Sequence, residues 1–417
     1  MAGVLRSAGV YEWSDEQKMI RDVMRRFIDA EVRPKLDELE KGELAPYDIL
    51  RKLYATFGLD SMARDSFKRS IEQDRAAADG SPLEDEGEIG MGMSGFALLP
   101  IIELCRVSPG IVAAMGVSLG LAAGTIMGRG SIEQKERWGL DLLTMEKIGA
   151  WAITEPDSGS DAIGGMKSTA RPDGDEYILN GSKTFITNGP YADTIVYYAK
   201  LDDRSDPRNR EVLTFVLDNG MPGLEQSKPL RKMGLHSSPT GQLFLTDVRV
   251  GPDRSLRGGT GGGSASAKAN FTVERSGVAA MALGVIEECL ALSVDYAKTR
   301  VQFGQPIGEF QLIQLKLAKM EVARLNVENL VFRFLEMSAA GRSPSLAEAS
   351  AMKLYAAQAA TEVAMEAVQL FGGNGYMAEY RVEQLARDAK SFQIYAGTDE
   401  IQVTHIAKDL LSRQSAT

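Results

Sequence analysis

The sequence predicts a multidomain α+β protein in which a β domain lies between two helical domains. Apolar residues recur at helical spacing in residues 14–60 and 96–149, and this periodicity returns between residues 267 and 413. Between these parts, short β-rich segments are separated by Gly, Pro, Asn and Asp. This order of helices, strands and helices is uncommon, because a β domain must be inserted into a helical protein.

The domain limits follow from these changes of pattern. We expect an N-terminal helical domain over residues 1–150, a middle β domain over 151–257 and a C-terminal helical domain over 258–417. A chain of 417 residues, of which 44% are hydrophobic, is long enough to form two or three packed units.

The first helix has recognisable start and stop signals. Ser14 followed by Gln17 is a capping-box pattern, in which each side chain bonds a backbone N–H of the other residue. Pro34 interrupts the helix, because proline has no N–H to continue the hydrogen-bond ladder. The apolar residues at helical spacing between these signals are Met19, Ile20, Val23, Met24, Phe27 and Ile28.

Residues 63–95 differ from the helical segments on both sides. They carry many charges and end in Gly-Met-Gly-Met-Ser. We interpret them as an irregular insertion exposed to solvent, with a lid or a partner contact as the alternative.

The middle domain contains four segments with strand-like composition, at residues 177–181, 194–198, 213–217 and 243–245. A glycine-rich join, Gly258–Gly263, leads from them to the C-terminal helices. A phosphate-binding loop needs a following Lys-Ser/Thr or a strand–loop–helix context, and neither is clear here. We therefore interpret the join as a flexible crossover.

Cysteine and histidine are too scarce for a metal site. Cys105 and Cys289 are far apart in sequence and lack metal-ligand spacing, so we expect buried or bystander thiols and no metal. Two cysteines form no disulfide framework, which fits a reducing compartment. His236 and His405 cannot build a histidine-rich zinc site, and neither lies in a nucleophile motif.

The charge and the hydropathy of the chain limit its partners. A formal net charge of −10 argues against nucleic acid as a partner, because phosphate binding needs a positive surface. No apolar run is expected to reach the roughly 18 to 20 residues of a membrane span. Residues 1–11 lack the pattern of a signal peptide, so we expect a cytoplasmic protein.

Four motifs in register carry a family resemblance. The chain reads WAITEPDSGSDA at 151–162, GSKTFITNG at 181–189, VQLFGGNGY at 368–376 and RDAKSFQIYAGTDEIQ at 387–402. Together they resemble the acyl-CoA dehydrogenase family over nearly the whole chain, apart from residues 63–95. The resemblance implies FAD as cofactor, a barrel-like or sandwich-like middle β domain and a C-terminal four-helix bundle.

The resemblance also implies where the flavin ring lies. A flavin needs a wall of hydrogen-bonding backbone and hydroxyl groups on one face. In the first motif, Thr154 would contact the pyrimidine edge of FAD, and Ser160 would lie near the pyrophosphate or the acyl-CoA. In the second, the Thr187 hydroxyl would lie near the reactive nitrogen. The complete set on the β domain is Trp151, Ile153, Thr154, Ser160, Phe185, Ile186 and Thr187.

The adenosine diphosphate tail of FAD is bound in this family by C-terminal helices of a neighbouring subunit. The resemblance therefore implies a homotetramer built as a dimer of dimers. Glycines let backbone approach phosphate closely. The residues that match the tail-binding positions are Arg300, Gln302, Phe303, Gln369, Gly372, Gly373, Thr398 and Glu400.

The catalytic base has two possible positions in the family. Most members carry a glutamate just before Gly-Thr in the last motif, where this chain has Ala396, which cannot take a proton. Isovaleryl-CoA and long-chain acyl-CoA dehydrogenases carry it instead on the helix after the β domain, immediately before an arginine. Here Glu274 precedes Arg275. The vacancy at one position and the glutamate at the other predict Glu274 as the base.

The expected reaction removes a proton from the α carbon of an acyl-CoA and a hydride from its β carbon. The base must lie across the substrate from the flavin. The backbone N–H of Ala396 is expected to polarise the thioester carbonyl. The residues expected around the substrate are Ser160, Val112, Gly116, Thr272, Arg275, Tyr395 and Gly397.

Residues 111–117 match the helix that forms the floor of the acyl cavity in the family. Small side chains at Val112 and Gly116 predict a deep cavity and therefore a long or bulky acyl group. An electron-transferring flavoprotein is the expected electron acceptor. The alternatives are an acyl-CoA oxidase and a non-catalytic subunit of a mixed tetramer.

Overall fold

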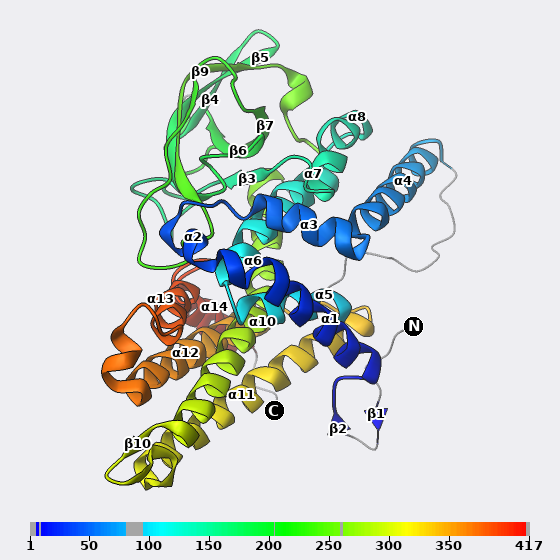
Figure 1. Cartoon of the computed structure of the whole chain (residues 1–417). Helices are drawn as coiled ribbons and strands as arrows, with labels where there is room; N and C mark the ends of the chain where they lie inside the picture. The colour runs from blue at the N-terminus through cyan, green and yellow to red at the C-terminus, as the bar shows by residue number, and fades with distance from the viewer. Residues whose placement is uncertain (1–5, 8–9, 81–94, 204, 259–261, 414–417) are drawn as a thin grey trace.

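The computed structural model describes residues 6–7, 10–80, 95–203, 205–258 and 262–413. Figure 1 shows helices below, a curled β-sheet above, and the long helix α10 (Gly262–Thr299) leading from the sheet into the helices. The predicted order of helices, strands and helices is confirmed.

The N-terminal part is helical, and its first helix begins and ends as predicted. Ser14 and Gln17 form both hydrogen bonds of the capping box at the start of α1 (Asp15–Glu31). A short 3₁₀ turn, η1 (Arg33–Lys35), contains Pro34 and separates α1 from α2. The following elements are α2 (Leu36–Lys41), α3 (Tyr47–Phe57), α4 (Leu59–Ala78), α5 (Gly95–Cys105), α6 (Pro109–Gly116), η2 (Val117–Ala123), α7 (Gly124–Arg129), α8 (Ile132–Gln134), η3 (Lys135–Gly139) and α9 (Leu140–Leu143).

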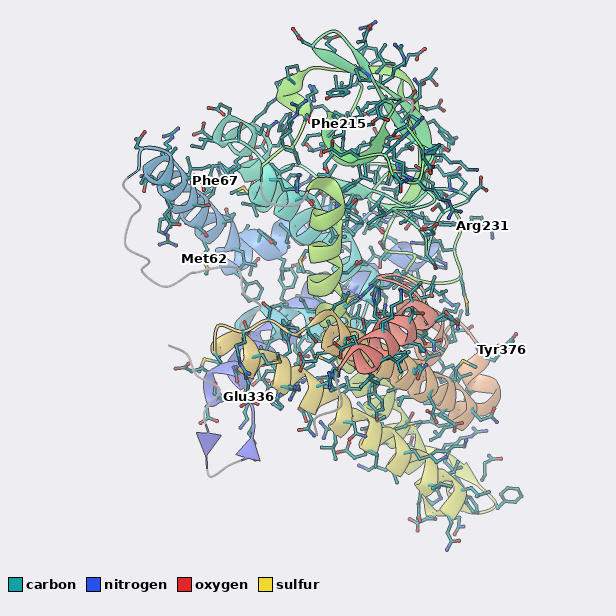
Figure 2. All side chains as sticks on the ribbon, turned by 180° about the vertical axis from the view of Figure 1, so that it is seen from behind. Met62, Phe67, Phe215, Arg231, Glu336 and Tyr376 are labelled. Atoms are coloured by element: carbon teal, nitrogen blue, oxygen red, sulfur yellow. The ribbon has the colours of Figure 1, made fainter. Side chains whose placement is uncertain are left out.

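The expected irregular insertion at 63–95 is wrong for its first half, because residues 63–78 belong to α4. Ala63, Phe67 and Ile71 recur every four residues and form one apolar face, and Figure 2 shows Phe67 between α4 and the neighbouring helices. Charged residues after Ile71 pair with η3, where Arg75 donates to Glu136 at 2.7 Å and Lys135 donates to Asp74 at 2.6 Å. Residues 81–94 lie outside the described part of the chain.

The middle part is a seven-stranded mixed sheet. Its strands are β3 (Gly149–Ala152), β4 (Thr169–Asp173), β5 (Glu176–Thr187), β6 (Thr194–Leu201), β7 (Val212–Asp218), β8 (Leu224–Gln226) and β9 (Thr240–Val250). Their order is β3-β6-β4-β5-β9-β8, with β7 on the other edge of β6. β6 pairs in parallel with β3 and β4, while the remaining pairs are antiparallel. The four predicted strand segments lie in β5, β6, β7 and β9.

The C-terminal part is a bundle of long helices. It contains α10, α11 (Gln311–Ala339), α12 (Leu346–Phe371), α13 (Val382–Phe392) and α14 (Asp399–Ser412). A hairpin of β10 (Val301–Gln302) and β11 (Gln305–Pro306) joins α10 to α11, and the 3₁₀ turn η6 (Gly372–Tyr376) joins α12 to α13. The remaining short elements are β1 (Arg6–Ser7), β2 (Val10–Tyr11), η4 (Pro252–Arg254) and η5 (Ile307–Glu309). Residues 259–261 of the predicted glycine-rich join lie outside the described residues, and Gly262 and Gly263 already belong to α10.

The first and last helical parts share one hydrophobic core. Ile102 of α5 and Leu283 of α10 are both fully buried in it. A Cβ atom on Gly284 would lie 2.2 Å from the carbonyl oxygen of Ile102, so only glycine allows α10 to lie this close to α5. Charged groups lie at the edge of the same interface, where Arg106, directly after α5, donates to Glu288 of α10 at 3.0 Å.

Two helical stretches are long and apolar enough to cross a membrane, which corrects the expectation that no apolar run reaches that length. They are Pro109–Arg129 and Glu274–Thr299, and more than half of each apolar window is buried inside the protein. Core helices of folded domains have the same property. Glu274–Thr299 and the first part of Pro109–Arg129 pack into the shared core, and residues 121–126 pack into the core beside the sheet.

Candidate active site

Glu274 lies on α10, on the face turned toward residues 393–398. Met281 lies two turns further along the same face, and its sulfur is 3.4 Å from the Tyr395 hydroxyl. The Glu274 side chain is half-buried, and no hydrogen-bond partner for its carboxylate is found among the described residues. A carboxylate without an internal partner at such a position is available to an external proton donor.

The environment of Glu274 favours a base that works near neutral pH. Burial raises the pKa of its carboxyl to about 7, because a charge in a poorly solvated site is unfavourable. The positive charges of Arg275 and Lys353 act in the opposite direction. A base with a pKa near the working pH combines availability of the ionised form with proton affinity.

The loop before Gly-Thr forms a tight turn whose two carbonyl groups are fixed. Ala396 and Gly397 both have left-handed backbone conformations, with φ of 55° and 88°. The Ala396 carbonyl accepts from Arg275 Nε at 3.2 Å and from Gln402 Nε2 at 3.0 Å. The Gly397 carbonyl accepts from Gln402 Nε2 at 2.7 Å and from Lys353 Nζ at 2.9 Å.

The backbone N–H of Ala396 takes no part in the hydrogen bonds that hold this turn. Within the part of the chain that the structure describes, no acceptor for it is found, although Ala396 is only 7% exposed. A buried N–H without a partner is costly, so such a group commonly serves a ligand. This geometry suits a donor to a carbonyl oxygen.

Arg275 points inward. Its side chain is buried, and besides Ala396 its guanidinium donates to Ser350 Oγ at 3.2 Å. Burial lowers the pKa of this group, and the neighbouring Glu274 raises it. The structure therefore places Arg275 against the turn. Tyr395, which directly precedes Ala396, packs against the shared core.

On the β domain, a buried ion pair shapes the first flavin motif. Glu155 accepts from Lys183 Nζ at 2.8 Å and from the backbone N–H of Ser168 at 2.9 Å. Lys183 also donates to the carbonyl of Ile153 at 3.2 Å, and the N–H of Thr184 donates to the carbonyl of Thr154 at 2.9 Å. These bonds tie the loop after β3 to β5, so residues 153–155 and 183–187 form one wall.

The side chains on this wall differ in exposure. Trp151, Ile153 and Ile186 are buried, and Trp151 Nε1 donates to the Tyr198 hydroxyl at 3.1 Å. Phe185 has a left-handed φ of 58° and is 68% exposed. An apolar side chain held outward in a strained conformation is often part of a binding surface. Thr154 and Thr187 are half-buried, and Ser160 is exposed.

The residues predicted for the FAD tail do not join this wall within one chain. Arg300, Gln302 and Phe303 lie in the exposed β10–β11 hairpin, which Figure 1 shows at the end of the molecule opposite to the sheet. Phe303 is 96% exposed. Gln369, Gly372, Gly373 and Glu400 are also exposed; Thr398 caps α14, and Figure 2 shows Tyr376 of η6 at the edge of the bundle.

The predicted substrate residues are only partly brought together. Gly116 ends α6, and a Cβ atom there would meet nothing within 4 Å, whereas Val112 is buried. Asn188 secures this helix to the sheet, because its amide donates to the carbonyls of Ala114 and Gly149, each at 2.9 Å. Thr272 lies in α10, but its side chain is outside the described set.

Sequence reasoning missed Lys353, Gln402, Glu155 and Lys183. Glu155, Lys183 and Gln402 stand inside the family motifs, and a polar side chain within such a motif is a signal for a structural or functional role. Lys353 carries no such signal, because a lysine in a helix is usually exposed.

Comparison with known proteins identifies the family. The models of the N-terminal, middle and C-terminal domains of acyl-CoA dehydrogenases match residues 14–64, 150–248 and 261–411. An acyl-CoA dehydrogenase of Bacillus subtilis (strain 168) is 37% identical over 399 residues, which is 95% of this chain and 98% of the relative. The chain belongs to the acyl-CoA dehydrogenase family. It is accordingly an FAD-dependent oxidoreductase.

Two further acyl-CoA dehydrogenases are similar to this chain over most of its length. A protein of Oryza sativa subsp. japonica named mitochondrial isovaleryl-CoA dehydrogenase is 31% identical, over 98% of this chain and 94% of its own. The solved structure of butyryl-CoA dehydrogenase from Megasphaera elsdenii superposes with a TM-score of 0.81 at 33% identity, and it covers 96% of this chain and 100% of its own.

Proposed function

We propose that this acyl-CoA dehydrogenase oxidises an acyl-CoA thioester to the trans-2-enoyl-CoA, with Glu274 as the base that removes the α-proton. The observation that carries the proposal is the pair formed by the half-buried Glu274 carboxylate and the partnerless N–H of Ala396, brought together by Arg275. Proton removal next to a thioester needs both a base and a donor to the carbonyl oxygen.

Glu274 is suited to the proton transfer by its surroundings. Its pKa of about 7 lies well above that of an exposed glutamate, so the Glu274 carboxylate is a stronger base than an exposed one. Burial also keeps water away from the carboxylate, and α10 restricts its orientation. The α-proton would move to a carboxylate oxygen of Glu274 while the substrate is held across the site.

The Ala396 N–H supplies the second requirement. As α-proton removal proceeds, negative charge develops on the thioester oxygen, and a preorganised donor stabilises this charge more than it stabilises the substrate. Because the donor is a backbone group, the missing carboxylate at residue 396 does not affect it.

The wall on the β domain fits a flavin ring. It offers the Thr154 and Thr187 side chains and an exposed aromatic group at Phe185, on a backbone fixed by Glu155 and Lys183. Bound FAD would supply the acceptor for the β-hydride. The chain itself orients the ring and excludes water.

The separation of the predicted FAD contacts supports a proposed assembly. The β10–β11 hairpin lies at the opposite end of the molecule from the sheet, which favours contact with the FAD of another subunit. We therefore propose a homotetramer arranged as a dimer of dimers, with closed symmetry. We also propose an electron-transferring flavoprotein as acceptor and the cytoplasm as location; the buried thiols of Cys105 and Cys289 support a reducing compartment.

The test is an anaerobic titration of the purified holoprotein with a panel of acyl-CoA thioesters. Loss of the yellow flavin absorbance, with formation of the 2-enoyl-CoA, is expected for at least one thioester. Turnover with oxygen is then compared with turnover with an artificial acceptor. Faster turnover with oxygen would make the protein an oxidase, and absence of bleaching with every thioester would overturn the proposal.

A further inference from the structure

We propose that Lys353 is a positioning residue for this dehydrogenation: its buried ammonium group holds the Ala396–Gly397 turn and supplies a positive field to Glu274. The inference rests on the proposed function, because it assigns a task to a residue that touches neither substrate nor FAD. No motif of the sequence pointed to this lysine.

The burial of Lys353 requires an explanation. Its side chain is 0% exposed, in the middle of α12. Transferring an ammonium group from water into a protein costs several kcal/mol unless partners compensate, and lysine is seldom found fully buried. An apolar side chain at this position of α12 would avoid this cost. We therefore infer that the positive charge of Lys353 has a task.

The contacts of Lys353 show what its charge is used for. Nζ donates to the Gly397 carbonyl at 2.9 Å and reaches Asp399 Oδ1 at 3.3 Å. It therefore binds both sides of Thr398, between the left-handed turn and the start of α14. Gln402 holds the same turn through neutral bonds to the Ala396 and Gly397 carbonyls. The direction of the Ala396 N–H is fixed by these bonds.

The second effect of Lys353 is electrostatic. In the described part of the chain, the titratable or charged side chains that interact with Glu274 are Arg275 on α10, Lys353 on α12 and Tyr395 in the turn. Behind them, Asp399 of α14 acts on Lys353, and Cys105 of α5 acts on Tyr395. Burial raises the pKa of Tyr395 and Cys105, so both are neutral near pH 7. Arg275 and Lys353 lower the pKa of Glu274 against the effect of burial. Lys353 thus acts on the base and on the carbonyl donor together.

The experiment compares Lys353→Met with Gln402→Met. Both variants loosen the turn, and each is expected to lower kcat at least about tenfold, because the carbonyl donor is displaced. Only Lys353→Met removes a charge. Its loss raises the pKa of Glu274, so the acid limb of the kcat/KM profile should move to higher pH by about one pH unit. In Gln402→Met the limb should stay in place.

Three further measurements keep the test decisive. Lys353→Gln, which retains one donor without the charge, should give the same shift if Lys353→Met does not fold. Lys200→Met is the matched control, because Lys200 is a buried lysine whose ammonium also donates to two backbone carbonyls, those of Gly164 and Pro207. It should lose stability without moving the limb. Binding of a 3-thiaacyl-CoA, which has an acidic α-proton and no β-hydride, reports proton removal independently of turnover.

The outcomes separate the inference from the proposed function. If the wild-type holoprotein oxidises acyl-CoA and the neutral Lys353 variants keep an unshifted acid limb, Lys353 has no electrostatic task and the inference is wrong. If Lys353→Met and Lys353→Gln also keep the wild-type kcat, Lys353 does not position the turn either. Failure of the wild-type protein to oxidise any acyl-CoA would overturn the proposed function instead.

Discussion

The Nε atom of Arg275 donates a hydrogen bond to the carbonyl oxygen of Ala396, 3.2 Å away. The helix that carries the proposed base therefore also holds the loop in which most relatives would carry it. We therefore expect both positions to face the same substrate, so that a carboxylate at either one could act on it.

Glu274→Gln should reduce kcat by at least about 10²-fold, because the amide keeps the shape of the side chain but cannot accept the α-proton. FAD content should be unchanged. Glu362→Gln, at an exposed glutamate of α12, is the control and should retain wild-type turnover. Wild-type kcat in Glu274→Gln would remove Glu274 from the mechanism.

The base should be transferable to residue 396. Ala396 already carries a Cβ atom in a left-handed conformation, so a glutamate there adds little backbone strain. Glu274→Gly should be inactive, and Glu274→Gly with Ala396→Glu should regain part of the activity. If the double variant is as inactive as Glu274→Gly while it binds FAD and acyl-CoA, the two positions do not face one substrate.

The activity should rise with pH through about 7, because Glu274 must be ionised to accept a proton and burial raises its pKa to about that value. The kcat/KM profile of the wild-type protein checks this. If the acid limb of this profile lay below pH 5, the Glu274 carboxylate would be solvated rather than buried.

The stability should change with pH in the opposite sense. Glu274 has a higher pKa in the folded state than in the unfolded state, so between about pH 4.5 and 7 the folded state binds more protons. Its contribution to stability is complete below this window and is lost as pH rises through it. Glu274→Gln should therefore have a higher Tm than the wild type at pH 8, and the difference should disappear at pH 4. The opposite order at pH 8 would contradict the assigned burial.

The exposed hairpin should matter for FAD retention. Phe303→Ser and Arg300→Ala should release FAD more readily, because we expect both residues to contact the cofactor of another subunit. Light scattering should give four times the chain mass of 45.2 kDa for the holoprotein. Leu312→Ser, at an exposed apolar residue in the first turn of α11, is a control for loss of FAD that comes from assembly alone. A monomer that retains FAD would refute the proposed interface.

Gly116→Glu should shift the acyl preference toward shorter chains. The space beside Gly116 accepts a Cβ atom without a clash, so the longer side chain can fill the proposed cavity without disturbing α6. Each excluded CH₂ loses about 0.8 kcal/mol of binding. The ratio of kcat/KM for long and short thioesters measures this. If the wild-type protein prefers butyryl-CoA and loses efficiency steadily with length, the deep-cavity prediction is wrong.

The sequence could predict the helix and strand classes because their periodicities are local. It could also point to Glu274, since a vacancy and a glutamate stand in two motifs. It did not predict α4, because charged residues between Ala63, Phe67 and Ile71 concealed an apolar face that packs against η3. It did not predict Lys353, because the bond to Gly397 joins residues 44 positions apart and depends on how α12 meets α14.

The close passage of α5 and α10 at Gly284 has a consequence for biosynthesis. The first helices emerge from the ribosome well before α10, with the whole sheet synthesised in between. Until α10 follows, the side of α5 that packs on α10 stays uncovered, although α1 can already bind α5 through Arg25 and Glu103. In the sheet, by contrast, β4–β5, β6–β7 and β8–β9 are pairs of strands adjacent in sequence and can form as they are made. The nascent chain therefore exposes an apolar helical surface for much of its translation. We expect chaperones to bind it at this stage.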